Sequence, residues 1–308
     1  MKTIKKISIF ILSLVLVLTL VGCQQATQTI STAYGLDNYQ TISDRNLSDE
    51  DLTILSTNRI MSSTVEITSN FTFSYSQSFG GFFEGSRTIT NSASSKGTAF
   101  FINSDGYLLT NAHVISLEKY ESLPDFKYVE RKISINFAES SLTFNVSIID
   151  YDQKLDLALL KIEDNALENI QYLKFYNLTD PAHSSYKTES AIKLLYGQSV
   201  LVVGNANGYG ISVTKGIVSA PLRYFSDSNN QKTEAIQIDA AVNSGNSGGP
   251  LSNMYGVVIG VVTFKVVTET SESLGYAIPA NVVINYLNSL ENKVTFHTTN
   301  TYNDSYTN

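Results

Sequence analysis

The stretch Gly245-Asn246-Ser247-Gly248-Gly249-Pro250 carries one serine hydroxyl among residues that are small or bend the backbone. A serine attacks a carbonyl well only when a base takes its proton and donors bind the oxyanion that forms. Glycines lack a Cβ and accept positive φ, so they let backbone N–H groups turn toward one point beside the hydroxyl. The same pattern also occurs in plain turns between strands, so the rest of the chain has to separate the two interpretations.

Two plans of serine hydrolase contain this pattern, and the order of the histidines separates them. In the nucleophile elbow of an α/β-hydrolase a helix follows the serine, and the acid and the histidine come later in the chain. Here Gly-Gly-Pro follows the serine and starts a helix poorly, and the only later histidine is His297, near the end of the chain. The opposite order fits, because His113 follows one strand-like run and Asp156 stands at the head of another.

His113, Asp156 and Ser247 are the residue types that acyl transfer needs. His113 can take the proton of Ser247 and return it to a leaving amine. A buried Asp156 beside the other ring nitrogen would fix the tautomer and stabilise the imidazolium. We expect the N–H groups of Gly245 and Ser247 to form the oxyanion hole, with Asn246 holding the turn between them. One such donor typically lowers the barrier by about 2.7–4 kcal/mol.

The composition limits the class of protein. The chain has 308 residues and a formal net charge of −7, and its abundance of Tyr and Phe favours β structure. An acidic protein lacks the basic face that phosphate binding requires, so we expect no nucleic acid partner. One cysteine allows no intramolecular disulfide, and the three histidines are too far apart in sequence for a metal motif. We therefore expect no metal and no cofactor.

Residues 1–22 have the form of a secretory leader, with three lysines before an apolar run over residues 7–21. That run is shorter than the roughly 20 residues of a spanning helix. It ends Leu20-Val21-Gly22-Cys23, which resembles the lipobox of bacterial lipoproteins. The resemblance implies cleavage before Cys23, a lipid on its sulfur and anchoring to the extracytoplasmic face of the cell membrane. An ordinary signal peptide with a chance cysteine is the alternative.

Residues 23–53 are mostly polar, and we assign them to a flexible tether. Ser48-Asp49-Glu50-Asp51 has the pattern of a helix start, which predicts a short helix to about residue 61. Short strand-like runs with turn signals then predict an all-β fold of antiparallel barrels or a sandwich. The expected strands begin at Val65 and include residues 97–102, 107–110, 133–137, 143–150, 157–162, 199–203, 211–219, 235–239, 257–264 and 276–278.

Between these strands the sequence predicts several irregular stretches. We expect a long surface loop over residues 76–95, an exposed insertion over 117–131 and irregular structure over 177–194. A proline followed by apolar residues at helical spacing predicts a short helix over 279–290. The Thr- and Asn-rich residues 291–308 are expected to form a disordered tail.

The chain resembles the trypsin-like serine proteases of the HtrA/Deg type. The residues that carry the resemblance are 97–101 with 104–114, 156–160, 213–219, 237–250 and 275–279. The resemblance implies two perpendicular six-stranded antiparallel β-barrels over residues 54–290, with the active-site cleft between them and a short C-terminal helix. The first barrel, over about residues 62–178, would carry His113 and Asp156, and the second, over about 195–278, would carry Ser247.

Two features depart from the family pattern. Gly204-Asn205-Ala206-Asn207-Gly208 stands where the family usually has Gly-Asn-Pro-Phe-Gly, so we expect this loop to differ. The residues after Leu290 are too few for the PDZ domain that most members carry, so we expect no control through such a domain within this chain.

The resemblance also predicts the specificity pocket. Ala241, six residues before the serine, would lie at the base of the S1 pocket, and Val261, Val262 and Thr263 would line it. Without an acid to pair with Lys or Arg, we expect cleavage after apolar residues in unfolded or exported proteins. Asn246 replaces the aspartate that pairs with a new N-terminus in zymogens, so we expect no activation by a cut.

The sequence leaves alternatives for the role of the aromatic residues over 71–83, for the class of protease and for catalysis itself. Aromatic residues over 71–83 are either a contact of the homotrimer that the family analogy favours or simply barrel core. A glutamyl-endopeptidase-like secreted protease is an alternative within the same class, although Gly249 stands where those enzymes usually have serine. A non-catalytic binding module on a protease fold is the alternative from another class.

Overall fold

The computed structural model describes residues 48–80, 85–138, 140–163, 167, 169–177, 194–226, 232–263, 274–290 and 294–299. Six antiparallel strands form a closed first barrel, as expected. In barrel order they are β1 (Thr64–Phe79), β2 (Gly85–Phe101), β3 (Tyr107–Thr110), β6 (Leu157–Ile162), β5 (Thr143–Asp152) and β4 (Lys127–Phe137). The alternation of apolar residues in β1 places Val65 and Ile67 inside this barrel, fully buried.

Six further strands form the second barrel, which closes through the pairing of β11 with β12. In barrel order they are β11 (Pro250–Asn253), β8 (Ser199–Gly204), β9 (Ser212–Ser226), β10 (Lys232–Ile238), β13 (Gly275–Pro279) and β12 (Val258–Val262). Two short strands, β7 (Phe175–Tyr176) and β14 (Thr298–Thr299), extend this sheet beyond β12 in parallel pairing. The expectation of two six-stranded antiparallel barrels is confirmed.

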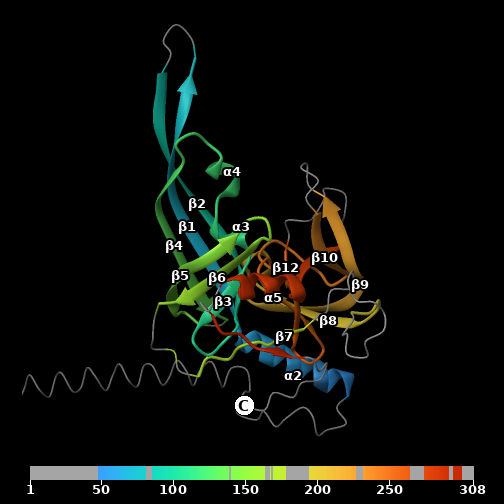
Figure 1. The fold of residues 1–308 in the computed structure, drawn as a ribbon. Coiled ribbons are helices and arrows are strands. Elements are labelled where there is room, and N and C mark those ends of the chain that lie inside the picture. Colours follow the sequence, from blue (N-terminus) through green and yellow to red (C-terminus); the bar gives the residue numbers. More distant parts are fainter. Residues whose placement is uncertain are drawn as a thin grey trace, which may run out of the picture.

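The described helices are short and lie around the barrels (Figure 1). They are α2 (Asp49–Ser62), α3 (Ala112–Ile115), α4 (Glu118–Glu121), the 3₁₀ turn η3 (Ala206–Gly208) and α5 (Ala280–Ser289). The predicted start of α2 is confirmed, since Ser48 and Asp51 form a reciprocal capping box. The helix therefore includes residues 49–53, which the sequence had placed in the tether, and Lys215 of β9 pairs with Asp49 at 2.8 Å.

The largest hydrophobic cluster joins the two barrels to the flanking helices. It contains Ile60 of α2, Phe100 and Leu109 of the first barrel, Val261 of the second and Val283 of α5, all fully buried. Burial of each large apolar side chain contributes roughly 1.5–3 kcal/mol, so this shared cluster holds the barrels against one another. Each barrel also has an inner cluster of its own.

The predicted surface loop over residues 76–95 is wrong, because β1 and β2 form one continuous hairpin. Their pairing runs without a register shift from Thr64 opposite Phe100 to Phe79 opposite Gly85. The hairpin projects well beyond the barrel (Figure 1). Most side chains of its outer half are exposed on both faces, so no alternation of apolar and polar residues announced it in the sequence.

The aromatic residues at the base of the hairpin pack within the chain. Phe73 is buried and contacts Tyr120 and Phe126, with ring centroids 4.9 and 5.7 Å apart. In the expected exposed insertion over residues 117–131, residues 117–126 therefore cover this base, and residues 127–131 form the first part of β4. Phe71 is also buried, so both aromatics belong to the barrel core, whereas Phe79 is half exposed.

The expectation of a disordered tail is wrong for residues 294–299. Phe175 donates its N–H to His297 O at 2.9 Å, and Asn177 donates to Thr299 O at 2.9 Å. Asn103 of the first barrel also donates to Thr295 O at 2.7 Å. The tail adds an edge strand through backbone hydrogen bonds. Such pairing leaves no recognisable pattern in a Thr-rich sequence. Most of the irregular stretch 177–194 lies outside the described residues.

Candidate active site

His113 lies in a single helical turn directly after β3. The neighbours Ala112, Val114 and Ile115 are buried and anchor this turn in the first barrel, while the side chain of His113 is 29% exposed. The side chain of Asn111 donates to Asp156 O at 2.8 Å and so ties the turn to the start of β6. The backbone of His113 is thus fixed by its buried neighbours, while part of its imidazole ring is exposed to solvent.

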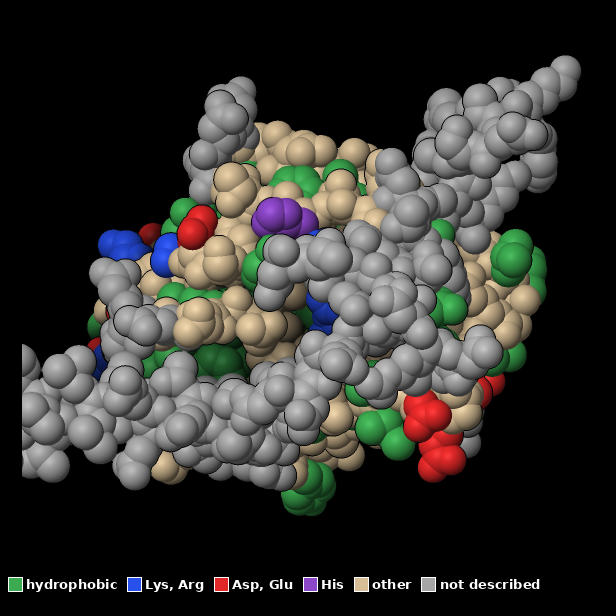
Figure 2. Space-filling view, turned by 90° about the horizontal axis from the view of Figure 1, so that it is seen from below, with side chains coloured by type: hydrophobic (Ala, Val, Ile, Leu, Met, Phe, Trp, Pro, Cys, Tyr) green, Lys and Arg blue, Asp and Glu red, His purple; other side chains and the backbone are tan. Residues whose placement is uncertain are grey.

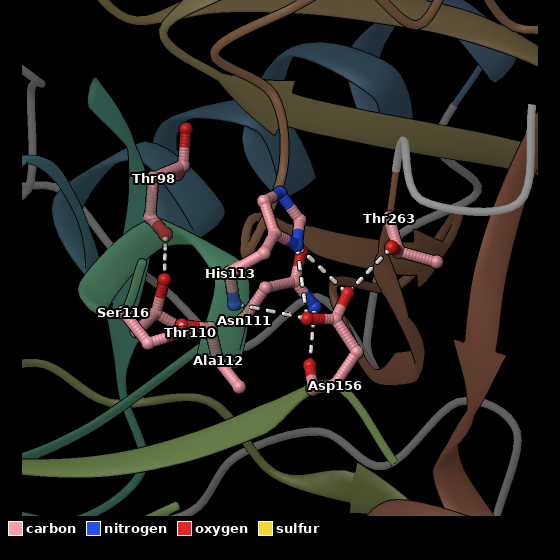
Figure 3. A network of polar contacts seen from close by, with 8 residues as sticks. All are labelled: Thr98, Thr110, Asn111, Ala112, His113, Ser116, Asp156 and Thr263. Atoms are coloured by element: carbon pink, nitrogen blue, oxygen red, sulfur yellow. Dashed lines mark hydrogen bonds and ion pairs between the residues drawn. The ribbon is translucent and has the colours of Figure 1, made fainter. Parts of the chain in front are cut away.

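Asp156 has a positive φ of 55° and is 5% exposed. Aspartate is one of the few residue types that occupy this left-handed conformation, and strain of this kind concentrates at functional sites. Figure 3 shows three groups converging on its carboxylate. The His113 N–H donates to Oδ1 at 3.0 Å, His113 Nδ1 lies 2.9 Å from both oxygens, and Thr263 Oγ1 donates to Oδ2 at 2.8 Å.

These contacts determine what the histidine can do. Beside a carboxylate, Nδ1 carries the hydrogen, which leaves the lone pair on Nε2 in the neutral ring. A ring held in this tautomer is ready to accept a proton at Nε2, and the carboxylate stabilises the imidazolium that results. The predicted pairing of His113 with Asp156 is present in the structure.

The loop that carries Ser247 is shaped by glycines rather than by side chains. Gly245 has φ 96° and Gly248 has φ 85°, both in the region that other residues rarely occupy. A Cβ at Gly245 would lie 2.1 Å from Asn205 O, and one at Gly248 would lie 2.2 Å from Thr110 Oγ1. Both positions therefore require glycine for space as well as for conformation.

The same contacts place the Ser247 loop against the His113 turn. Gly248 packs on Thr110 and on the N atom of Asn111, the residues that lead into that turn. Thr98 of β2 donates its N–H to Ser247 O at 2.9 Å. Gly248 in turn donates to Val262 O at 2.9 Å, one residue before the threonine that binds Asp156. The Ser247 loop thus lies beside the His113 turn where the barrels join, and His113 and Asp156 are in direct contact.

The predicted oxyanion hole consists of backbone around Asn246. The N–H of Asn246 donates to Asn243 O at 3.0 Å, so this residue holds the turn. The N–H of Asn207 donates to Ser244 O at 2.6 Å. Because the C=O and N–H of a trans peptide point in opposite directions, this bond also fixes the direction of the Gly245 N–H. The hole itself, formed by the N–H groups of Gly245 and Ser247, stays a prediction.

The predicted S1 residues do not lie together as one lining. Ala241 is exposed. Val261 and Val262 are both buried but belong to different hydrophobic clusters, because successive side chains of a strand point to opposite faces. Val262 shares its cluster with Ala240, the neighbour of Ala241. Residues 264–273, which follow Thr263, lie outside the described residues.

The sequence did not predict the contacts of two threonines, Thr263 and Thr98, that support the site. Thr263 was expected to line the pocket, whereas its hydroxyl donates to Asp156. Thr98 also went unrecognised, although its hydroxyl donates to Gly245 O at 2.7 Å and accepts from Asn205 N at 2.9 Å. A single threonine in a strand carries no motif, so only the fold identifies these contacts.

The remaining expectations concern the leader, membrane-spanning segments, metal binding and surface charge. Cys23, His183 and the apolar leader lie outside the described residues. Within the part that the structure describes, no helix combines the length and hydropathy needed to cross a membrane. No three His, Cys, Asp or Glu side chains of these residues form a metal-binding group. On the face in Figure 2 the described Lys and Arg side chains are few and form no continuous patch, and some of them lie beside Asp and Glu side chains.

Comparisons with known proteins agree with this geometry. The profile of the trypsin-like peptidase domain matches residues 97–261. A probable periplasmic serine endoprotease DegP-like of Pseudomonas putida is 34% identical over 201 residues, which cover 65% of this chain and 35% of that protein. Serine protease Do-like HtrA of Lactococcus lactis is 35% identical over 233 residues, covering 70% of this chain and 50% of that protein.

A solved structure has a similar fold. The HtrA-type protease AlgW with tripeptide aligns with a TM-score of 0.52 and 25% identity, over 77% of this chain and 62% of that chain. This chain therefore spans half or less of the length of the two curated relatives and more of the solved structure.

Proposed function

Because the chain belongs to the trypsin-like peptidase family, we propose that it is a serine endopeptidase that acts through His113, Asp156 and Ser247. The observation that carries the proposal is the placement of His113 Nδ1 at 2.9 Å from both oxygens of a buried Asp156, beside a glycine-shaped serine loop. This arrangement combines an oriented base with a nucleophile on a rigid turn.

The proposed reaction proceeds through an acyl-enzyme. His113 Nε2 takes the proton of Ser247 Oγ as this oxygen attacks the scissile carbonyl, and the Gly245 and Ser247 N–H groups bind the oxyanion. His113 then gives the proton to the leaving amine, and the C–N bond breaks. Water, activated by the same histidine, hydrolyses the ester and regenerates Ser247. Asp156 holds the ring throughout and stabilises its protonated form.

The substrates we propose are unfolded or exported proteins, cleaved after apolar residues. Support comes from Ala241, which offers no acidic side chain to pair with Lys or Arg. The name of the relative from Pseudomonas putida supports an extracytoplasmic endoprotease, and the name of the relative from Lactococcus lactis supports a serine protease. Asn246 in place of an aspartate supports activity without a cut N-terminus.

We further propose that a lipid on Cys23 tethers the protein to the extracytoplasmic face of the membrane. The lipobox-like Leu20-Val21-Gly22-Cys23 supports this, and residues 24–47 provide the tether before α2. A homotrimer is proposed from the family analogy alone, since Phe71 and Phe73 are used inside the chain. Metabolic labelling with a palmitate analogue tests the anchor. Label on the wild-type protein and none on Cys23→Ser is the expected result.

The activity is tested by labelling the folded full-length protein with a fluorophosphonate probe. Ser247→Ala is the control, and cleavage of an unfolded protein such as reduced, carboxymethylated lactalbumin is mapped in parallel. We expect label and cleavage with the wild type and neither with Ser247→Ala. Absence of both from the folded wild type would favour the non-catalytic binding module. Cleavage only after Lys or Arg would contradict the pocket assignment.

A further inference from the structure

The two outer edges of the β1–β2 hairpin differ. The outer edge of β1 is paired with β4 as far as Ser74 opposite Lys127. Beyond that point Ser76 donates its N–H to Pro124 O at 2.8 Å and its hydroxyl to Asp125 at 2.6 Å. The β1 edge is therefore covered for most of its length.

The outer edge of β2 is open over most of the strand. Its pairing with β3 is limited to Phe100 and Phe101. Between Ser86 and Lys96 no further strand pairs with it within the described part of the chain. Figure 1 shows this arm projecting away from the barrels. A long, unpaired edge is a template for any extended chain, and proteins normally cover or interrupt such edges.

The hydrogen-bond phase of β2 identifies which residues face the open edge. Phe101 donates toward the β1 side, to Ser63 O at 2.9 Å, whereas Ile102 donates to Tyr107 O of β3 at 3.0 Å. Residues of a strand alternate between its two edges, and the pairing with β1 has no bulge. The even-numbered residues of β2 therefore present both N–H and C=O to the open edge; between the hairpin turn and Thr98 these are Ser86, Thr88, Thr90, Ser92, Ser94 and Lys96.

This open edge leads directly to the candidate nucleophile. Thr98, an even-numbered residue, donates its edge-facing N–H to Ser247 O at 2.9 Å. Gly97 is so close that a Cβ there would lie 3.0 Å from the same oxygen. The edge thus begins beside Ser247 and extends from it toward the turn of the hairpin.

We infer that the open edge of β2 from Thr88 to Lys96 binds the part of a polypeptide substrate that follows the scissile bond, as an added antiparallel strand. The direction follows from that of β2, which runs toward Ser247, so an antiparallel partner runs away from it. This portion is the leaving half in acyl-enzyme formation. The inference rests on the proposed function and names its substrate class: chains that stay extended for about eight or more residues beyond the cut, at two residues per outward pair.

The composition of the edge agrees with recognition through the backbone. Apart from Lys96, its outward-facing residues are small hydroxyl residues, which form no pocket for a particular side chain. Main-chain bonds supply the affinity when a strand is added to a sheet, and pockets supply the specificity. An edge of this kind selects extended chains with little regard to sequence.

The test uses two peptides with the same residues before the scissile bond, taken from the mapped cleavage sites. One ends two residues after the cut, and the other continues for eight. Two or three added backbone bonds should raise kcat/KM for the long peptide by about tenfold or more. Ser92→Pro removes one outward N–H without taking a bond from β1, and Ser92→Ala is the matched control.

We expect Ser92→Pro to lose most of the advantage of the long peptide while it cleaves the short peptide like the wild type. Ser92→Ala should keep the advantage. Equal kcat/KM for the two peptides with the wild type would overturn the inference and leave the proposed function intact. Cleavage of neither peptide would instead count against the proposed function.

Amide hydrogen exchange tests the edge independently of cleavage and of the proline variant. In full-length Ser247→Ala, the reduced, carboxymethylated lactalbumin should slow exchange at the outward amides of Thr90, Ser92 and Ser94. The inward amides of Asn91 and Ala93, which already bond to β1, serve as internal controls. Binding of the unfolded protein without added protection at the outward amides would overturn the inference.

Discussion

The two halves of the candidate site are built by different means. The half around Asp156 is a polar network of side chains, in which His113 and Asn111 of the first barrel and Thr263, which follows β12 of the second, all bond to Asp156. The half from the second barrel is backbone, shaped by Gly245 and Gly248 at positive φ. Hydrogen bonds position the side chains of the first half, whereas backbone conformation and close packing position the Ser247 loop of the second.

This difference predicts different failures. A conservative change in the polar half should leave the fold in place and remove the chemistry, because another side chain of the same shape can occupy the space. A change as small as one methyl group in the backbone half should disturb the fold, because no space exists for it. Three substitutions test this contrast, from the largest expected effect to the smallest, and a fourth at Glu66 of β1 tests a carboxyl outside both halves.

Asp156→Asn should lower kcat by about 10⁴-fold, because an amide no longer holds His113 in the productive tautomer. Asparagine also tolerates the positive φ at this position, so far-ultraviolet circular dichroism should match that of the wild type. Asp105→Asn, at an exposed aspartate of the same barrel, is the control and should keep full activity. Comparable kcat for Asp156→Asn and the wild type would remove Asp156 from the mechanism.

Gly248→Ala should destabilise the protein by about 3 kcal/mol or more, because its methyl group meets Thr110 Oγ1 and Thr98 O in a position of positive φ. Gly197→Ala is a matched control, with a similar φ of 78° and no atom within 4 Å of the added Cβ. Backbone strain alone should cost that variant about 1–2 kcal/mol. Urea unfolding measures both, and equal losses would mean that packing at Gly248 contributes nothing.

Thr263→Val removes the hydroxyl that donates to Asp156 and keeps the shape of the side chain. Loss of a hydrogen bond to a charged group is worth about 1.5–3 kcal/mol, so kcat should fall by about tenfold or more. Thr233→Val on β10 is the control for the same exchange in a strand remote from the carboxylate. An unchanged pH profile and kcat in Thr263→Val would show that the contact is structural only.

Glu66→Gln is expected to have the smallest effect. Burial raises the pKa of Glu66, and Lys96 partly opposes this. A carboxyl whose folded pKa is raised costs stability when ionised, so the cost is present at neutral pH and disappears as pH falls through the folded pKa. Since the group is only partly buried, solvent screens the effect, and the Tm of Glu66→Gln should exceed that of the wild type by roughly 1–2 °C at neutral pH. A lower Tm for Glu66→Gln would show that the ionised carboxylate of Glu66 stabilises the fold instead of destabilising it.

The sequence predicted most of what lies in the barrels and at the centre of the site. Strands β3 and β6 have the predicted bounds, because apolar residues bounded by turn signals mark buried strands. The pairing of His113 with Asp156 followed from chain order and residue type. These features depend on local patterns that a single sequence displays.

Other features depend on contacts between distant segments. The sequence predicts a loop over residues 76–95, in the outer hairpin, because strands exposed on both faces show no hydrophobic alternation. The pairing of residues 298–299 with β7 rests on backbone bonds, which any sequence can make. Thr263 and Asp156 are 107 residues apart in sequence, so only the folded structure shows that the threonine hydroxyl donates to the carboxylate.

The central claim is that the two halves act as one catalytic unit, and kcat/KM for His113→Ala, Ser247→Ala and the double variant tests it most directly. Each single substitution should lower kcat/KM on a mapped peptide by about 10⁶-fold, because the residues act as a unit, and the double variant should lose no more than either alone. A double variant whose loss equals the product of the two single losses would contradict the account, since it would show that His113 and Ser247 act independently.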